Sequence, residues 1–108
     1  MTDEKLHFMS VMHPTDPTKA ASRDNWTPQD HATFAEHWAN LERLKDEGVL
    51  ILAGRAQDAD GGGPAICIIE VDSEAAAQRI FAAEPFIKRG FATGTLRPYR
   101  IAISRNEL

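Results

Sequence analysis

Four apolar segments of the chain have the composition of β-strands. They cover residues 6–13, 49–55, 65–71 and 93–103, and polar or turn-forming residues separate them. In the first three segments apolar side chains occupy both alternating faces, whereas a strand with one solvated face alternates apolar and polar residues. Pro98 cannot donate to a neighbouring strand, so the last segment is expected at a sheet edge or a bulge. The pattern therefore predicts a sheet with two apolar faces.

Two further segments are predicted to be helices. Residues 28–47 carry apolar side chains at helical spacing, with Thr27 as the N-cap and Gly48 as the C-terminal stop. Residues 73–84 begin with a serine that can cap a helix, and Pro85 prevents the helix from continuing.

The segments between these elements are expected to be loops. Residues 14–27 contain two prolines and little apolar content, which favours a surface loop that could fold over the mouth of a pocket. Residues 58–64 predict a flexible hairpin tip, because their glycine run lacks the Lys-Ser/Thr pair of a phosphate-binding loop. Residues 87–90 are expected to form a turn before the last strand.

The predicted order of elements is β-α-β-β-α-β, which is the ferredoxin-like α+β plan. Right-handed crossovers place both helices on one face of a four-stranded antiparallel sheet and leave the other face uncovered. At about 25 cal/mol per Å², covering several hundred Å² of aliphatic surface is worth several kcal/mol. We therefore expect a homodimer or a higher homo-oligomer, in which a second copy covers this face.

Composition restricts the remaining possibilities. The chain has 108 residues, of which 43% are hydrophobic, and this suits one domain spanning residues 1–108. The net charge is −4 and the basic residues are scattered, so no nucleic-acid partner is expected. The charged N-terminus has no apolar run typical of a signal peptide or a membrane span, which favours a cytoplasmic protein without a membrane partner. The single Cys67 is expected to be a small buried apolar side chain.

His37 is the main candidate for chemistry because it lies on the apolar stripe of the first predicted helix. On a helical wheel it shares a face with Phe34, Trp38, Leu41 and Leu44. A leucine would pack there without a polar atom to satisfy. His37 is therefore either functional or a core histidine whose nitrogens have found hydrogen-bond partners.

Several short motifs resemble the YCII-related family, whose members have the fold of the dimeric α/β-barrel superfamily. The matching features are His37, Gly48, the strand VLILAG ending at Gly54, Glu84-Pro85-Phe86 and Gly90. The resemblance spans roughly residues 6–103. It implies a dimeric α/β barrel and a catalytic dyad of a histidine and an acid. The acid, usually aspartate in the family, is carried over to Glu84.

The replacement of aspartate by Glu84 lengthens the side chain by one methylene. Glu84 is also the last residue of the second predicted helix, where the macrodipole disfavours a negative charge unless a cation such as protonated His37, Arg55 or Lys88 compensates.

Further residues are expected to bind the substrate around this dyad. Arg55 could hold an anionic or phenolic oxygen, Asp58 could be an alternative acid, as could Asp60, and Phe86 lies on the turn that lines the pocket. No metal site is predicted, because the histidines do not share a helix face at i,i+3 or i,i+4 spacing. No cofactor is expected.

The main functional hypothesis is a cofactor-independent small-molecule enzyme, lyase-like or hydrolase-like, in which the His37–Glu84 pair transfers a proton. The resemblance implies a substrate of the hydroxylated or halogenated aromatic class, since a protein of this family is linked to such a dehydrochlorination. The alternative is a non-catalytic dimeric module that binds a small ligand. A third possibility, a monooxygenase or haem-handling protein, requires a pocket large enough for a planar ligand.

Overall fold

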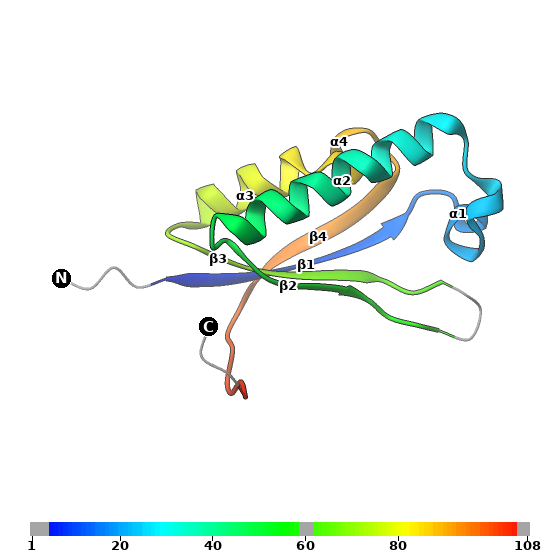
Figure 1. The fold of residues 1–108 in the computed structure, drawn as a ribbon. Coiled ribbons are helices and arrows are strands. Elements are labelled where there is room, and N and C mark those ends of the chain that lie inside the picture. The colour runs from blue at the N-terminus through cyan, green and yellow to red at the C-terminus, as the bar shows by residue number, and fades with distance from the viewer. Residues whose placement is uncertain (1–4, 59–61, 106–108) are drawn as a thin grey trace.

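The computed structural model describes residues 5–58 and 62–105. Four strands form the sheet of Figure 1: β1 (Leu6–Pro14), β2 (Leu50–Arg55), β3 (Ala65–Val71) and β4 (Ala92–Tyr99). The helical elements are α1 (Pro17–Ala21), η1 (Arg23–Asn25), α2 (Pro28–Asp46), α3 (Glu74–Ala83) and α4 (Pro85–Lys88).

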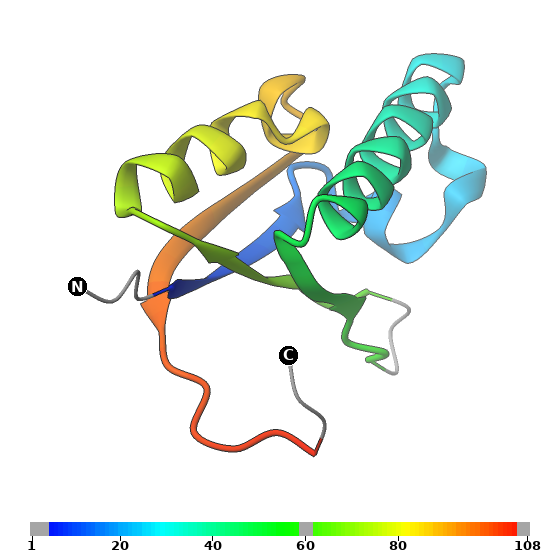
Figure 2. The same ribbon diagram turned by 60° about the vertical axis from the view of Figure 1, so that its left-hand side comes forward.

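The strands pair in the antiparallel order β2-β3-β1-β4, and α2, α3 and α4 lie on one face of the sheet (Figure 2). This arrangement confirms the ferredoxin-like α+β fold. β4 is an edge strand, as the proline at position 98 indicated.

The hydrophobic core lies between the helices and the sheet in two clusters. One cluster is centred on Phe8, Ile69 and Ala77, and Ala77 is fully buried. The other joins Met12 to Phe91, close to the end of the sheet that α1 and α4 approach. The second cluster supports the site described below.

Helix α2 begins and ends where the sequence indicated. Thr27 and Asp30 form a capping box, in which each side chain accepts a hydrogen bond from the backbone of the other. The helix ends at Asp46, and Gly48 has a φ of 78°. That left-handed conformation favours glycine and turns the chain into β2.

The prediction of a loop over residues 14–27 was wrong, because this segment contains α1 and η1. Asp16 caps α1 and Pro17 occupies its first turn, while Ser22 caps η1. These signals were present in the sequence, but helices of five and three residues have no apolar periodicity to reveal them.

The structure also corrects two boundaries near the C-terminus. Residues 85–88 form α4, so the predicted turn at 87–90 begins later, and Gly90 takes the left-handed φ of 77°. β4 ends at Tyr99 rather than at residue 103, because Tyr99 already pairs with His7 next to the start of β1. Beyond that point β1 offers β4 no partner.

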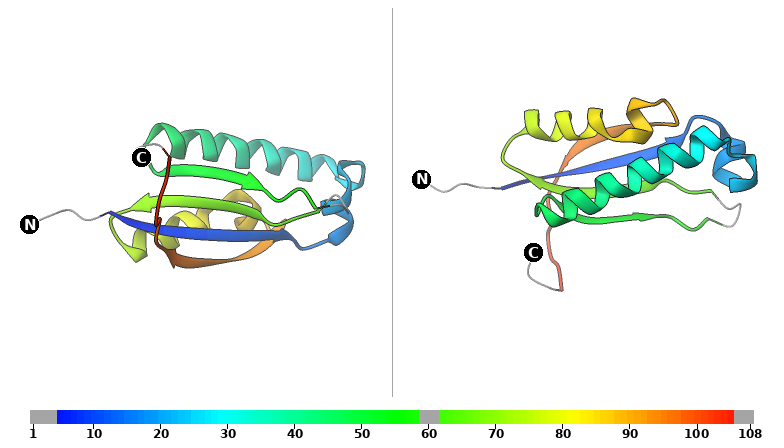
Figure 3. Two further views of the ribbon diagram at one scale, coloured as in Figure 1. Left: turned by 90° about the horizontal axis from the view of Figure 1, so that it is seen from below. Right: turned by 45° about the horizontal axis from the view of Figure 1, so that its top comes forward.

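The second face of the sheet has no helix over it in the described part of the chain (Figure 3). Met9 and Leu52 both pair with Ile68 from opposite sides, which places the three side chains in one row on this face. Leu52 is 52% exposed and Tyr99 is 43% exposed. The predicted apolar character of both faces is therefore confirmed.

Candidate active site

The structure brings His37 and Glu84 into direct contact. Nδ1 of His37, on α2, is hydrogen-bonded to Oε1 of Glu84, at the junction of α3 and α4. Both residues are buried, with exposed fractions of 8% and 7%. A carboxylate only accepts hydrogen bonds, so this contact places a proton on Nδ1. The two residues are called the dyad below.

Glu84 is held by the backbone as well as by the histidine. It ends α3 and caps α4, and its Oε2 accepts a hydrogen bond of 2.7 Å from the backbone N–H of Phe86. The expectation of an unfavourable helix C-terminus was therefore incomplete, because the same carboxylate also caps the start of the next helix.

The imidazole of His37 is held in one orientation by aromatic rings. Phe86 stacks on it with ring centroids 4.0 Å apart and an angle of 10° between the planes. Phe34, one helical turn earlier, lies 6.0 Å from it. With Glu84 on Nδ1 and rings against its sides, the imidazole has little freedom to turn.

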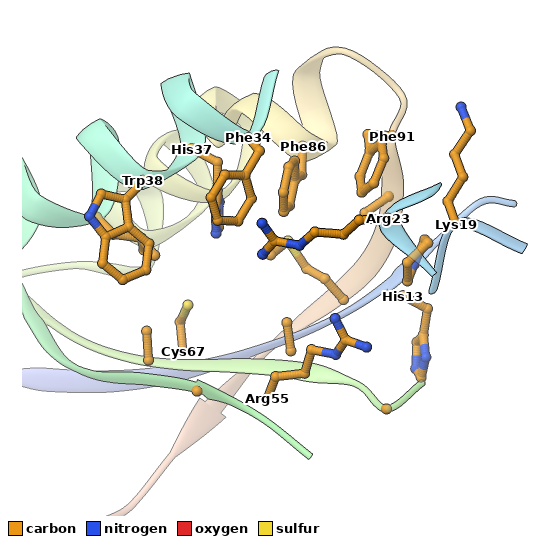
Figure 4. Close-up of a pocket in the computed structure, with 18 of the residues that line it drawn as sticks. His13, Lys19, Arg23, Phe34, His37, Trp38, Arg55, Cys67, Phe86 and Phe91 are labelled. Atoms are coloured by element: carbon orange, nitrogen blue, oxygen red, sulfur yellow. The ribbon is translucent and has the colours of Figure 1, made fainter. Parts of the chain in front are cut away.

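Nε2 of His37 is the nitrogen that remains available. It forms no hydrogen bond within the described structure, where every fully buried side-chain nitrogen or oxygen has a partner. Nε2 must therefore be accessible, and His37 lines a cavity into which a ring nitrogen is turned in Figure 4. This geometry suits a general base or acid.

The cavity has a volume of about 260 Å³ and lies between α2, the sheet and residues 15–27. Its aromatic lining residues are Trp26, Phe34, Trp38, Phe86 and Phe91, and its charged ones are Lys19, Arg23 and Arg55. None of the described residues that line it is acidic. The cavity is therefore lined by aromatic rings and basic side chains, in a protein whose net charge is −4.

The predicted substrate-binding residues are only partly brought together. Phe86 and Arg55 line the cavity, and Nη2 of Arg55 donates a hydrogen bond of 3.1 Å to the carbonyl oxygen of Ala20 on α1. Asp58 is not among the residues that line this cavity, and it borders a neighbouring hollow with Pro17 and Gly62. Asp60 lies outside the described residues.

Four cavity residues come from the segment that was predicted to be a loop: Pro14, at the end of β1, and three residues that follow it. Lys19, Arg23 and Trp26 line the cavity from residues 15–27, which are called the roof segment below. In Figure 4 Arg23 reaches into the cavity, whereas the ammonium group of Lys19 points away from it. Trp26 was the signal in the sequence that this segment packs against the protein, because a large aromatic side chain in a polar connector needs an apolar environment. Its Nε1 donates a hydrogen bond of 2.9 Å to the carbonyl oxygen of Lys19, which closes the segment on itself.

An ion pair anchors the roof segment to α2. Nζ of Lys19 lies 2.7 Å from Oδ2 of Asp30. The hydrogen bond from Lys19, together with one from the Thr27 backbone, lowers the pKa of Asp30 below its usual value. The capping box and this ion pair therefore share one carboxylate.

Cys67 lies on the floor of the cavity, and burial raises the pKa of its thiol. The expectation that Cys67 is a buried side chain is confirmed. A neutral thiol is a poor nucleophile, so the environment of Cys67 does not activate it.

The described residues offer neither a metal-binding cluster nor a membrane-spanning helix. They contain no group of three or more His, Cys, Asp or Glu side chains that could hold a metal ion. No helix among them is both long and apolar enough to cross a membrane.

Comparisons with known proteins bear on this geometry. The model of the YCII-related domain matches residues 8–100. The comparison with curated proteins finds no match.

Two solved structures share the fold. One is 5-chloro-2-hydroxyhydroquinone dehydrochlorinase (TftG) from Burkholderia phenoliruptrix AC1100 in complex with 2,5-dihydroxybenzoquinone. It is 19% identical, with a TM-score of 0.61 over 86% of this chain and 93% of that chain. The other is SnoaB, a cofactor-independent oxygenase from Streptomyces nogalater. It is 14% identical, with a TM-score of 0.50 over 96% of this chain and 99% of that chain.

Proposed function

The chain belongs to the YCII-related family, and we propose that it is a cofactor-independent enzyme that transfers a proton to or from a small aromatic substrate. The observation that carries the proposal is the dyad. A buried carboxylate occupies Nδ1 of His37, while Nε2 is accessible at an aromatic cavity. A protein that only binds a ligand does not require one imidazole nitrogen to be held by a buried carboxylate while the other stays accessible.

In the proposed reaction, Nε2 of His37 accepts a proton from an acidic O–H or C–H group of the substrate. Glu84 keeps the other proton on Nδ1 and stabilises the imidazolium that forms. Phe86 holds the ring plane, and its backbone N–H holds the carboxylate. The same proton then returns from Nε2 to the product or to a leaving group.

The cavity supports a hydroxylated aromatic as the substrate class. Its side walls carry aromatic rings that stack on flat molecules, and Arg55 supplies a cation beside them. A volume of about 260 Å³ suits a single substituted ring better than a large planar cofactor such as haem. The substrate of TftG belongs to the same chemical class. An elimination of the lyase type begins with this proton transfer from the substrate, whereas a hydrolysis begins with transfer of a proton from water to the same nitrogen.

The proposal is tested by turnover of chlorinated and hydroxylated benzenes, including 5-chloro-2-hydroxyhydroquinone, followed by NMR in D2O for halide loss and ring deuteration. His37→Gln should reduce the rate by about 10²–10⁴-fold. Glu84→Gln should also reduce it, because the amide does not stabilise the imidazolium. His31→Gln, an exposed residue on the same helix, is the matched control and should keep the rate.

Binding of these compounds without any turnover by the native protein would support the non-catalytic module instead. An undiminished rate in His37→Gln would also contradict the proposal.

We also propose that a second copy of the chain covers the open face of the sheet. Leu52 and Tyr99 expose apolar surface on this face, of the kind that protein interfaces bury, and the buried Ile68 lies in the same row as Leu52. Sedimentation of the native protein should give a dimer, and Leu52→Lys should shift it towards the monomer. Ala35→Lys, an exposed substitution on α2, should leave the dimer intact. A native monomer at micromolar concentration would contradict the proposal.

A further inference from the structure

The cavity has a charge that the proton transfer does not require. Lys19, Arg23 and Arg55 all line it, and none of the described residues that line it is acidic, although Asp30 outside the cavity is paired with Lys19. Low-dielectric walls strengthen the field of such a group of cations. A site of this kind attracts anions.

The three cations differ in their contacts. Lys19 is paired with Asp30 at 2.7 Å, and Arg55 donates to the carbonyl oxygen of Ala20 at 3.1 Å. The guanidinium of Arg23 forms neither an ion pair nor a hydrogen bond with any of the described residues. Arg23 is therefore the cation whose donors remain available to a ligand.

Aromatic rings hold the guanidinium of Arg23 at the cavity. Its central carbon lies 4.4 Å from the centroid of Phe34 and 4.9 Å from that of Trp26. These contacts use the flat faces of the guanidinium, and its N–H groups point outwards in its plane. Such a fork matches the two oxygens of a carboxylate.

The position of Arg23 relative to the dyad fits one substituted ring. Phe34 is a neighbour of both, because its ring centroid lies 4.4 Å from the guanidinium carbon of Arg23 and 6.0 Å from the imidazole centroid of His37. In Figure 4 the guanidinium of Arg23 points along the cavity towards these rings. A benzene ring beside Phe34 can therefore present one substituent to Arg23 and another to Nε2.

We propose that the substrate is a hydroxylated aromatic carboxylic acid and that Arg23 binds its carboxylate. This inference rests on the proposed function and names the substrate class of the same site. A carboxylate is ionised throughout the neutral range, whereas a phenol has a pKa near 10 and keeps its proton until His37 removes it. Arg23, which is always charged, thus binds the carboxylate of the substrate, which is always ionised in this pH range. The hydroxyl group of the substrate remains for the dyad.

The test compares the binding of 4-hydroxybenzoate with that of 4-hydroxybenzamide, its neutral analogue of the same shape. Titration followed by tryptophan fluorescence should give a dissociation constant at least about tenfold lower for the benzoate in the native protein. Arg23→Gln should remove this preference and change the constant for the amide by less than about twofold. Arg79→Gln removes the same charge from the exposed side of α3 and should keep the preference.

Further variants separate folding and chemistry from recognition. Arg23→Gln should unfold at the same urea concentration as the native protein, because Arg23 is exposed, and Arg23→Lys should keep only part of the preference. His37→Gln should keep the full preference even though proton transfer is lost. The proposal is overturned if the native protein binds neither probe or both equally, or if Arg23→Gln still prefers the benzoate. None of these outcomes depends on whether the dyad is catalytic.

Discussion

The dyad and the roof segment face the same cavity but are built in different ways. The dyad is buried, and contacts from α2, α3 and α4 determine the position of each of its groups. The roof segment is mostly exposed. Its polar ties to the rest of the chain include the hydrogen bonds of Thr15 to the carbonyl oxygens of Gly90 and Phe91, the hydrogen bond from Arg55 to Ala20 and the Lys19–Asp30 ion pair. The proposed proton transfer thus lies on the buried wall of the cavity, and the proposed recognition of the carboxylate lies on the more exposed wall.

This difference has a physical consequence for how the two regions respond to change. Buried groups with complete hydrogen bonding are costly to disturb, whereas exposed segments with few contacts open at low free energy. We therefore expect substitutions in the dyad to affect the whole fold, and substitutions in the roof segment to act locally.

The largest effect is expected for Glu84→Ala. The substitution removes the acceptor for both Nδ1 of His37 and the Phe86 backbone N–H, and it leaves one buried and one partly buried donor without a partner. The free energy of unfolding should fall by about 3–5 kcal/mol, as measured by urea denaturation. Glu36→Ala, which breaks the exposed pair with Arg89, is the control and should have a much smaller effect. Equal losses of unfolding free energy in Glu84→Ala and Glu36→Ala would contradict the distinction between the buried dyad and exposed groups.

The same distinction explains how much of the site could be predicted from the sequence. His37 was found because a polar residue on an apolar helix stripe is visible in the periodicity, and Glu84 because the resemblance to the YCII-related family pointed to it. Arg55 was found at the end of a predicted strand. These residues lie on or next to long elements, whose patterns are strong.

The roof segment could not be predicted in the same way. Its short helices are held by contacts between residues distant in sequence, such as Arg55 with Ala20, and no local pattern encodes them. The end of β4 was missed for a similar reason, because it depends on where β1 begins. The predicted role of Asp58 depended on where the hairpin places that residue, and it borders the neighbouring hollow instead.

An intermediate effect is expected for Thr27→Ala, at the border between the two regions. Loss of the capping box should cost about 1 kcal/mol of unfolding free energy. Hydrogen exchange should become faster in the first turn of α2 and in the roof segment, while the amide of His37 stays protected. Ser73→Ala removes the cap of α3 at similar cost and should not change exchange in the roof segment. Faster exchange at His37 would show that the two regions are one cooperative unit.

The smallest effect is expected for Asp30→Asn, and it should depend on pH. Because hydrogen bonds from Lys19 and the Thr27 backbone lower the pKa of Asp30 in the folded state, its carboxylate stabilises the fold above the ordinary value near 4. That stabilisation is lost as the pH falls through the lowered pKa.

At pH 7 the native protein should therefore unfold at a higher urea concentration than Asp30→Asn. This difference between the two midpoints should shrink as the pH falls below 4. Asp24→Asn, in η1 of the same segment, is the control and should differ little from the native protein at either pH. A gap that persists unchanged in acid would mean that the charge of Asp30 does not hold the roof segment, and that its cap geometry alone does.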